Sequence, residues 1–558
     1  MYLLYLKLNT TKQTSTVRLS AVAAAIPSYS PIGLSSRLSP LKLCFGFERT
    51  QNQLGQALLI GSATDPKLVT FQFGSTISDS IKFRMRSLSS QFGINFCFFE
   101  QMRLLRHMRA TRAIFCVPLL LAVFLLSTYR KKNEAPPPMI IYSAYFHYIS
   151  NDTIGFQAIG FSFCQDRDSV VELTVRGVKF ELKADALQAG CPDDTGCHWA
   201  NYRWSAQLPS TIDLPRSVTL SHTDKSLTVP VRKSQLTERR DGLEACVAPL
   251  YLYNRWVRLI EFVELYRSQG VSHFYIYMSS VSILVKDVLK YYQKQGIVTI
   301  VKWPDLPKYK DTDPNTSVFR IGQGAAHADC MMKSRAQFVA VVDLDDYIRM
   351  TSGDIVTNLK KWLKKDPEIG SFAFSRAMVR QKARVGNLTN WTKISFSQLK
   401  RADICDSCQN NVKSIVMPDR VDIASTHSVW RQRQIPRSAD SYRNFEVPAK
   451  KAICYHARYG LDWNQAENDQ QENYIRKSYF PVKHVDNVKG NFTIIMEKIS
   501  QKHESLITPD TSEYINVCTK YISGICQTPH RTCPEARAMD KWYFVSDEAL
   551  AKGSGVIF

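Results

Sequence analysis

Apolar strand-like segments alternate with helix-like segments along the middle of this chain. The predicted strands are residues 243–252, 273–278, 297–303 and 337–343, and the predicted helices between them are residues 255–270, 281–295 and 322–335. Gly270 and Gly296 stand where the first two helices end, a usual position for glycine. Strands that alternate with helices over short connections are typical of a sheet of parallel strands with helices packed on it. We therefore predict an α/β fold, Rossmann-like with a mostly parallel sheet, for residues 241–500.

The region before this alternation has a period of two. Residues 169–182 alternate apolar and polar side chains, and residues 217–231 do so around a turn at 223–225. We predict a small β-rich domain over residues 155–240. Residues 130–154, which contain three consecutive prolines, are predicted to form an extended stem.

Residues 113–129 form an uncharged apolar segment of 17 residues, near the shortest length that spans a bilayer. Basic residues flank it on both sides: Arg103, Arg106, Arg109 and Arg112 before it, and Arg130, Lys131 and Lys132 after it. A buried core helix or a cleaved signal sequence is the alternative, but no small-residue cleavage site follows. Because the heavier basic flank is N-terminal, we predict a single transmembrane anchor with residues 1–112 in the cytosol and the rest in the lumen.

The net charge of +22 does not require a nucleic-acid partner. Residues 1–112 carry 14 Lys and Arg against 4 Asp and Glu, whereas residues 133–558 carry 55 against 46. The excess is concentrated near the apolar segment, and the remainder shows no basic stripe of the kind that binds nucleic acid. We therefore expect no nucleic-acid binding.

Residues 1–101 show no sustained periodicity and are rich in Ser, Thr and Leu. Met102 begins a short basic sequence that leads directly into the apolar segment. We interpret residues 1–101 as a gene-model extension or a disordered tail.

Cysteines and glycosylation sequons favour a lumenal location. Eleven of the 14 cysteines follow the apolar segment, a density that suits an oxidising compartment, and the odd number leaves at least one without an intramolecular partner. Cys405 and Cys408 form a lone CxxC, for which a disulfide end or a buried thiol is favoured over zinc. Residues 501–558 contain three cysteines and are interpreted as a disulfide-stapled appendage. Five sequons follow the segment, at Asn151, Asn315, Asn387, Asn390 and Asn491.

Two carboxylates mark the end of the strand at 337–343. In open α/β sheets, ligands bind beyond the carboxyl ends of the strands. Alternate side chains of an extended backbone point the same way, so Asp343 and Asp345 can converge on one cation while Leu344 points into the core. Carboxylate oxygens suit Mg²⁺ or Mn²⁺, which would stabilise a diphosphate leaving group. The alternative is a solvated turn after a strand.

Several ordered sequence blocks resemble glycosyltransferase family 92 over roughly residues 240 to 500. They are PLYLYNRWVRLIEFVELYRSQGVSHFYIY, VLKYYQKQGIV, GQGAAHADCMMKSRAQFVAVVDLDDYI, KSIVMPDRV with the later STHSV, and CYHARY. The resemblance implies a GT-A type fold, a nucleotide-sugar donor, a divalent metal such as Mn²⁺ and a type II Golgi anchor. Characterised members are inverting galactosyltransferases that use UDP-galactose and act on fucose in N-glycan cores.

The chain departs from the family at two positions. It has Asn254-Arg255-Trp256 where the family usually has Asn-Glu-Trp, and Asp346 where the family commonly has Glu after the metal motif. The second change keeps a carboxylate. The first reverses a charge near the expected nucleotide, which bears on donor choice and on activity.

The resemblance also suggests further site residues. GT-A enzymes often take a metal ligand from a later histidine, for which His427 and His456 are the candidates, each equally explained as a structural histidine. Arg458 could bind phosphate or lie on the surface, and Asn254 could contact the nucleotide or cap the helix that follows it. Gln323 and Asp329, on the helix before the Asp343 strand, could face the donor or be ordinary polar helix positions.

An inverting transfer needs a general base for the acceptor hydroxyl. The candidates, among which the sequence does not discriminate, are Asp403, Asp406, Asp419 and Asp422. The sequence thus predicts a metal-dependent hexosyltransferase with a glycan or glycoprotein acceptor. The alternative, motivated by Arg255, is a catalytically inactive lumenal protein that binds glycans or serves as a scaffold.

Overall fold

The computed structural model divides the chain into two units, residues Met1–Ala135 and Pro136–Phe558. Five strands are described in the first unit. In the second, the structure describes residues 139–150, 152–164, 170–187, 197–234, 239–308, 313–381, 388–408, 411–458, 474–503, 514, 518, 526, 528–546 and 555–557. No helix of these described parts is long and apolar enough to cross a membrane. The predicted anchor at 113–129 lies outside the described residues, so it stays a prediction.

The first unit contains an antiparallel sheet with the strand order β2-β1-β3-β4-β5. Its strands are β1 (Leu4–Asn9), β2 (Arg18–Ala23), β3 (Ala57–Asp65), β4 (Leu68–Gln72) and β5 (Ile81–Arg84). The sequence interpretation expected no regular structure here. The difference arises because the strands are short, and alternation over four to nine residues is easily missed beside Ser- and Thr-rich segments.

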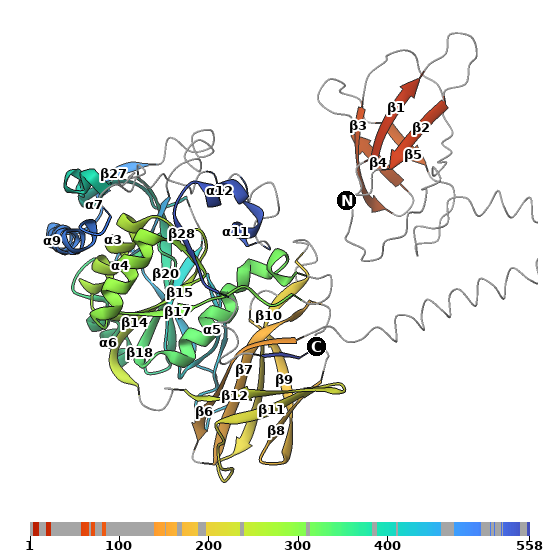
Figure 1. Ribbon diagram of the computed structural model, residues 1–558, viewed down its shortest axis with the longest axis horizontal. Helices are drawn as coiled ribbons and strands as arrows, with labels where there is room; N and C mark the ends of the chain where they lie inside the picture. The colour runs from red at the N-terminus through yellow and green to blue at the C-terminus, as the bar shows by residue number, and fades with distance from the viewer. Residues whose placement is uncertain are drawn as a thin grey trace, which may run out of the picture. The chain divides into compact units, whose positions relative to one another are not determined.

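The small β-rich domain opens the second unit (Figure 1). Its sheet has the order β12-β11-β8-β9-β10-β7-β6-β13, and its apolar core includes Phe156, Leu173 and Trp204. The strands are β6 (Met139–Ser150), β7 (Thr153–Phe163), β8 (Val171–Val175), β9 (Val178–Ala186), β10 (Trp199–Pro209), β11 (Ser217–His222), β12 (Lys225–Pro230) and β13 (Arg232–Lys233). The predicted stem at 130–154 was therefore too long, because β6 is a largely buried strand of this sheet.

A mixed sheet of eleven strands forms the larger domain. The strands on its main path follow the order β17-β15-β14-β18-β22-β20-β21-β27. They are β14 (Arg240–Leu250), β15 (Val271–Met278), β17 (Val298–Lys302), β18 (Ala336–Val342), β20 (Ile369–Arg380), β21 (Arg401–Cys405), β22 (Val412–Val416) and β27 (Ile475–Ser478). The remaining strands are β19 (Asp346–Met350), β25 (Arg443–Val447) and β26 (Ala452–Arg458).

Only part of this sheet is parallel. Strands β17, β15, β14 and β18 pair in parallel, as the alternation of strands and helices predicts, whereas β22 pairs antiparallel with both β18 and β20. The prediction of a mostly parallel sheet is corrected to a mixed one. Strands β25 and β26 also pair in parallel with β20, but β21 and β22 pair with it antiparallel, so parallel and antiparallel pairs mix around β20.

Helices cover both faces of the mixed sheet (Figure 1). One face packs on α3 (Trp256–Arg267), α4 (Ile283–Lys294), α6 (Ile355–Lys365) and α9 (Val482–Ser500). The other face packs on α5 (Gln323–Lys333) and on the small β domain. Side chains of β14 alternate between these two cores, with Ala245 and Val247 on one face and Cys246 on the other.

Residues 528–546 form an integral part of the larger domain rather than the separate appendage expected from sequence. They contain α11 (Pro529–Thr532), α12 (Pro534–Ala538) and β28 (Trp542–Phe544), and β28 pairs with β16 (Ser280–Ser282). Farther on, β29 (Gly555–Ile557) pairs with β6 of the small domain. The end of the chain thus contacts both domains.

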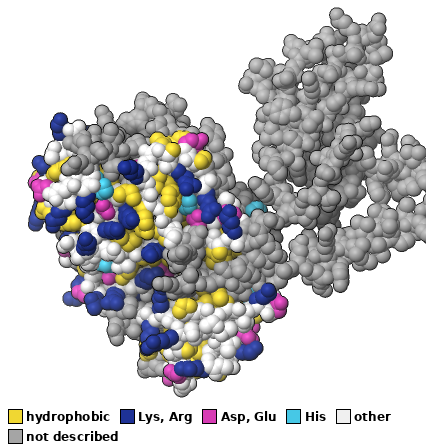
Figure 2. All heavy atoms as spheres, in the orientation of Figure 1, with side chains coloured by type: hydrophobic (Ala, Val, Ile, Leu, Met, Phe, Trp, Pro, Cys, Tyr) yellow, Lys and Arg dark blue, Asp and Glu magenta, His cyan; other side chains and the backbone are white. Residues whose placement is uncertain are grey.

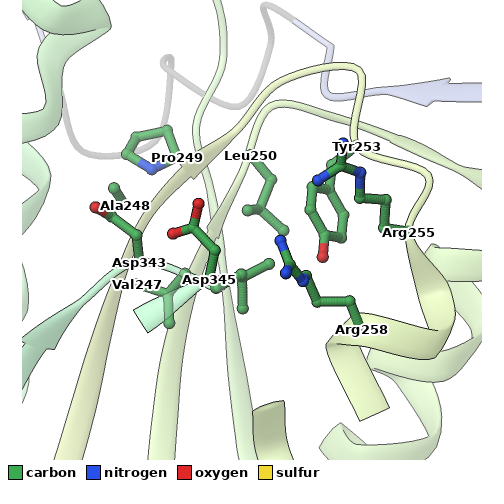
Figure 3. Close-up of a pocket in the computed structure, with 10 residues that line it drawn as sticks. Val247, Ala248, Pro249, Leu250, Tyr253, Arg255, Arg258, Asp343 and Asp345 are labelled. Carbon is green, nitrogen blue, oxygen red and sulfur yellow. The ribbon is translucent and has the colours of Figure 1, made fainter. Parts of the chain in front are cut away.

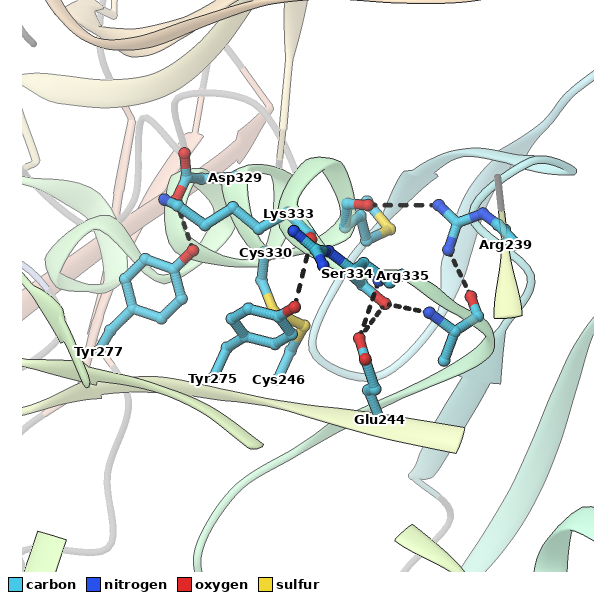
Figure 4. The surroundings of a disulfide bond; sticks show 12 residues. Arg239, Glu244, Cys246, Tyr275, Tyr277, Asp329, Cys330, Lys333, Ser334 and Arg335 are labelled. Carbon is cyan, nitrogen blue, oxygen red and sulfur yellow. Dashed lines mark hydrogen bonds and ion pairs between the residues drawn. A yellow bond between two sulfur atoms is a disulfide. The ribbon is translucent and has the colours of Figure 1, made fainter. Parts of the chain in front are cut away.

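Disulfides agree with the expectation of paired cysteines. Within the described part of the chain, disulfides include Cys197–Cys526, Cys246–Cys330, Cys405–Cys408 and Cys518–Cys533, and the buried Cys454 is free. The CxxC is therefore closed on itself rather than a zinc ligand pair. Figure 4 shows the second bond, which joins β14 to α5.

Candidate functional site

The candidate site lies where the parallel part of the sheet changes direction. Strand β14 lies between β15 and β18, so the chain leaves β14 toward one side and returns to its other side. Connections diverge at such a point, which leaves a crevice at the carboxyl ends of the two strands. A cavity of about 190 Å³ occurs there, lined by Val247, Ala248, Pro249, Leu250, Tyr253, Arg255, Arg258, Asp343, Leu344 and Asp345.

Asp343 and Asp345 both reach this cavity, as predicted, although the backbone reason differs (Figure 3). Strand β18 ends at Val342, and the next residues form a turn in which the Asp346 amide donates to the Asp343 carbonyl at 3.0 Å. The turn, rather than an extended backbone, brings the two carboxylates to the same side. Leu344 is 6% exposed and packs in the core, as expected, although it also lines the cavity.

Asp346 is the buried centre of the acidic cluster. Its carboxylate lies 2.8 Å from His456 Nδ1, 3.0 Å from Lys413 Nζ and 3.2 Å from an Arg376 nitrogen. Burial alone would raise the pKa of Asp346, but Lys413, His456 and Arg376 hold it far below its usual range. Asp346→Ala would leave buried cations uncompensated, which commonly costs about 3–5 kcal/mol.

The Asp343 carboxylate already accepts hydrogen bonds from two neighbouring side chains. Its carboxylate accepts from Lys413 Nζ at 2.6 Å and from Gln323 Nε2 at 3.2 Å. Burial would lower the pKa of Lys413, but Asp343 and Asp346 together raise it above its usual range. Lys413 is thus a fixed positive charge beneath the turn.

Asp345, Asp346 and His456 are the group best placed to hold a cation. One ligand atom from each lies within 4.8 Å of the others, and His456 Nδ1 is 3.7 Å from Asp345. Two carboxylates and an imidazole are a donor set that suits Mn²⁺ or Mg²⁺ with water completing the shell. The residues present therefore fit a divalent ion. Asp345 and His456 are among the ligands predicted from sequence, whereas the predicted Asp343 lies outside this group and Asp346 takes its place.

His427, the other predicted histidine ligand, lies outside that group. Its Nδ1 is 3.3 Å from the Val412 carbonyl. Burial, Lys413 and Arg376 lower its pKa to about 4, so the ring is neutral near pH 7. His427 therefore lies beside the acidic cluster but is not one of the three grouped ligands.

Two arginines line the cavity opposite the carboxylates (Figure 3). Arg258, on the first turn of α3, donates to the Ala457 carbonyl at 2.5 Å, and the Ala457 amide donates to the Asp345 carbonyl at 2.8 Å. Arg255 precedes the helix at its N-cap position, where no side chain caps the helix. Guanidinium groups match the geometry of phosphate oxygens, so this side of the cavity suits a diphosphate.

The remaining predicted donor contacts divide. Gln323 reaches the cluster through Asp343, whereas Asn254 does not cap α3 but donates to Asp540 at 3.2 Å. Asp329 is not brought to the cavity, because its fully buried carboxylate accepts from Tyr145 at 2.6 Å and from Tyr277 at 2.5 Å. The side chain of Arg458 lies outside the described residues.

None of the predicted general bases lines the cavity, and each has a basic partner. Asp403 pairs with Arg476, Asp406 with Lys477 and Asp419 with Arg420. Asp422 binds Arg203 and Arg431, and these arginines, with burial opposing them, hold its pKa far below its usual range. We assign no base among them.

Sequence reasoning singled out Arg255 but missed three other basic residues of the site, Arg258, Arg376 and Lys413. Lys413 and Arg258 stand in the blocks KSIVMPDRV and PLYLYNRWVR, so their membership in those blocks was the available signal. Arg376 gave no signal, since it lies in β20, outside all of those blocks.

Comparison with known proteins agrees with this geometry. A model of glycosyltransferase family 92 matches residues 241–496. Two Caenorhabditis elegans proteins named as members of that family are 26% and 20% identical to this chain, each over 61% of it and 67% of their own length. A structure of S. aureus TarS residues 1–349 with UDP covers 54% of this chain and 88% of its own, at 10% identity and a TM-score of 0.21, too low to support an argument. Residues 241–496, which supply both sides of the cavity, therefore form a glycosyltransferase family 92 domain.

Proposed function

We propose that this glycosyltransferase is a metal-dependent hexosyltransferase that uses a nucleotide-sugar donor. The observation that supports the proposal is the cavity at the carboxyl ends of β14 and β18, with Asp343 and Asp345 on one side and Arg255 and Arg258 on the other. A nucleoside diphosphate is stabilised by a cation and by hydrogen-bond donors, and this cavity offers carboxylates that would hold the cation and guanidinium groups that would donate. By resemblance to the family, we propose galactose from UDP-galactose as the transferred group, with inversion, and fucose of an N-glycan core as an acceptor.

The protein's own groups would serve the diphosphate in distinct ways. Arg255 and Arg258 would bind phosphate oxygens and orient the leaving group. Asp345 and His456 would hold a divalent cation, which supplies positive charge to a departing diphosphate. Lys413 keeps Asp343 and Asp346 in place from below through ion pairs at 2.6 and 3.0 Å.

We also propose that the enzyme is a type II membrane protein of the Golgi with residues 133–558 in the lumen. The basic flanks of residues 113–129 support this orientation, and the disulfides of the described part suit an oxidising compartment. Nucleic acid is not an expected partner. On the face shown in Figure 2, lysines and arginines are dispersed among acidic and uncharged side chains.

A donor panel tests the proposal. The full-length chain, purified in detergent, is incubated with Mn²⁺ and a set of UDP- and GDP-sugars, with a fucosylated N-glycan as acceptor. We expect transfer from UDP-galactose that EDTA abolishes and Mn²⁺ restores. Nucleotide binding without turnover of any donor would favour the alternative of an inactive glycan-binding protein, and metal-independent transfer would contradict the metal role.

A further inference from the structure

The cavity depends on a short loop with an unusual backbone. Residues 251–255 follow β14 and contribute Tyr253 and Arg255 to the cavity. Leu252 has φ of 44°, in the left-handed region that a leucine rarely adopts. Such a conformation persists only where surrounding contacts fix it.

The contacts that fix Leu252 come from the C-terminal segment. The Leu252 side chain is 2% exposed and packs in a cluster with Cys533 and Ala536, which Trp542 and Phe544 extend. Each of these partners lies in residues 528–546, beyond the part of the chain that matches the family.

The backbone of the loop is tied to the same segment through β16. The Leu252 amide donates to Ser280 Oγ at 2.8 Å and the Tyr253 amide to the Ser280 carbonyl at 3.2 Å. Strand β16 then pairs with β28, with Ser280 opposite Phe544. The loop therefore forms the inner edge of a small sheet whose outer strand is β28.

Asp540 makes a side-chain contact with the loop. Its carboxylate accepts from Asn254 Nδ2 at 3.2 Å and from the Lys541 amide at 2.6 Å. Asn254 stands between the two residues that line the cavity, Tyr253 and Arg255, so the hydrogen bond acts directly on the segment that would face the donor.

The C-terminal segment is itself firmly anchored. Cys518–Cys533 binds it covalently, and Cys197–Cys526 joins the chain just before it to the small domain. His530 and Arg531 both contact the Asp305 carboxylate, at 2.9 and 2.5 Å. It can therefore act as a fixed support for the loop.

We propose that residues 528–546 hold the loop 251–255 in its cavity-forming conformation and that Asp540 is a positioning residue for donor binding. The inference rests on the proposed function, and it assigns a role in that site to a segment outside the family domain. Loss of Asp540 should weaken binding of a nucleoside diphosphate without slowing the chemical step, because Asp540 acts through Asn254 and touches no reacting atom.

The experiment compares three variants of the full-length chain. Asp540→Ala removes the acceptor of Asn254, Asp540→Asn keeps an oxygen that can accept, and Glu535→Ala removes an exposed carboxylate of the same segment that does not contact the loop. Affinity for UDP with Mn²⁺ is measured by calorimetry, donor KM and kcat by transfer, and amide exchange over residues 250–256 by mass spectrometry. For Asp540→Ala we expect about tenfold weaker UDP binding, a kcat within about twofold and faster exchange at Leu252 and Tyr253. Asp540→Asn and Glu535→Ala should match the wild type.

The outcomes separate this inference from the proposed function. Unchanged loop exchange in Asp540→Ala, or faster exchange with unchanged UDP affinity, would overturn the inference. Equal losses in kcat and affinity together with a lower melting temperature would also overturn it, because they indicate general destabilisation. If the wild type binds no UDP, the proposed function fails while the exchange measurement still decides whether the segment holds the loop. Should Asp540→Ala not fold, Asn254→Ala removes the other partner and is measured in the same way.

Discussion

Two aspartates of the same domain, Asp329 and Asp345, differ in whether their carboxylates remain available to a ligand. We call the surroundings of Asp329 closed and those of Asp345 open. Asp329, on α5, is fully buried, and its carboxylate accepts hydrogen bonds from Tyr145, Tyr277 and Lys333 (Figure 4 shows the last two). Asp345 has a side chain 32% exposed and faces a cavity. A carboxylate whose oxygens are already satisfied by the protein has a structural role, whereas one at the wall of a cavity keeps the capacity to bind a ligand.

The contact between the small β-rich domain and the larger domain also contains carboxylates whose partners come from the protein itself. Arg203 of β10 binds Asp185 of β9 at 2.7 Å and Asp422 at 2.6 Å, and Arg431 binds the same two carboxylates at 2.7 and 2.5 Å. Each carboxylate has two arginine partners and each arginine has two carboxylates. These four interdomain charges are therefore paired with one another, unlike those of the cavity, which has opposite charges on opposite walls.

The largest effect is expected at the closed site. Asp329→Ala removes the buried partner of the partly buried Lys333 ammonium, which commonly costs about 3–5 kcal/mol of unfolding free energy. Chemical denaturation measures this loss, and donor KM of the folded fraction should not change. A changed KM with unchanged stability would show that Asp329 serves the donor after all, as the sequence first suggested.

Asp345→Ala should show the opposite pattern. Loss of the carboxylate weakens cation binding and leaves diphosphate charge uncompensated, which commonly costs on the order of 10²–10³ in rate. Stability should change little, since the side chain is one-third exposed, and Asp345→Asn should be nearly as damaging because the amide lacks the charge. Transfer assays and thermal melts on the same preparation provide both values. Full metal-stimulated activity in Asp345→Ala would remove this motif from the mechanism.

Sequence reasoning found the open site more readily than the closed one. The pattern of strands and helices placed Asp343 and Asp345 at the end of β18, because local periodicity determines where such a strand ends. The partners of Asp329 and Asp422 are far away in sequence, 184 residues for Tyr145 and 219 for Arg203. No local pattern reports such pairs, so both aspartates were taken as functional candidates. The antiparallel half of the sheet and the docking of residues 528–546 were missed for the same reason.

A smaller effect is expected in the pH dependence of stability, through a histidine close to this interdomain contact. His147 on β6 is buried, and its burial, with Arg433 and Arg203 nearby, lowers its pKa from 6.5 to about 3. Below pH 6.5 the unfolded chain takes up a proton that the folded chain does not, so stability falls with pH across the window from 6.5 to about 3. One such histidine contributes a slope of about 1.4 kcal/mol per pH unit, or about 2 kcal/mol between pH 6.5 and 5. Urea unfolding at several pH values gives the free energy of unfolding as a function of pH. Its slope should be shallower for His147→Gln than for the wild type, and an identical slope would contradict the lowered pKa of His147.

The smallest effect concerns which of two sequons carries a glycan, and it follows from whether the asparagine amide is already hydrogen-bonded within the protein. Asn315 is 4% exposed, and its amide accepts from the Leu306 amide at 2.7 Å and donates to the Leu306 carbonyl at 2.8 Å. A glycan is attached through that amide nitrogen, which the folded protein already uses, whereas Asn390 is exposed. If residues 133–558 are lumenal, glycopeptide mass spectrometry should find a glycan at Asn390 and none at Asn315. Asn390→Gln should then increase gel mobility by one glycan without changing the melting temperature. A glycan at Asn315 would show that this loop opens in the cell, and the absence of glycan from every sequon would contradict the lumenal orientation.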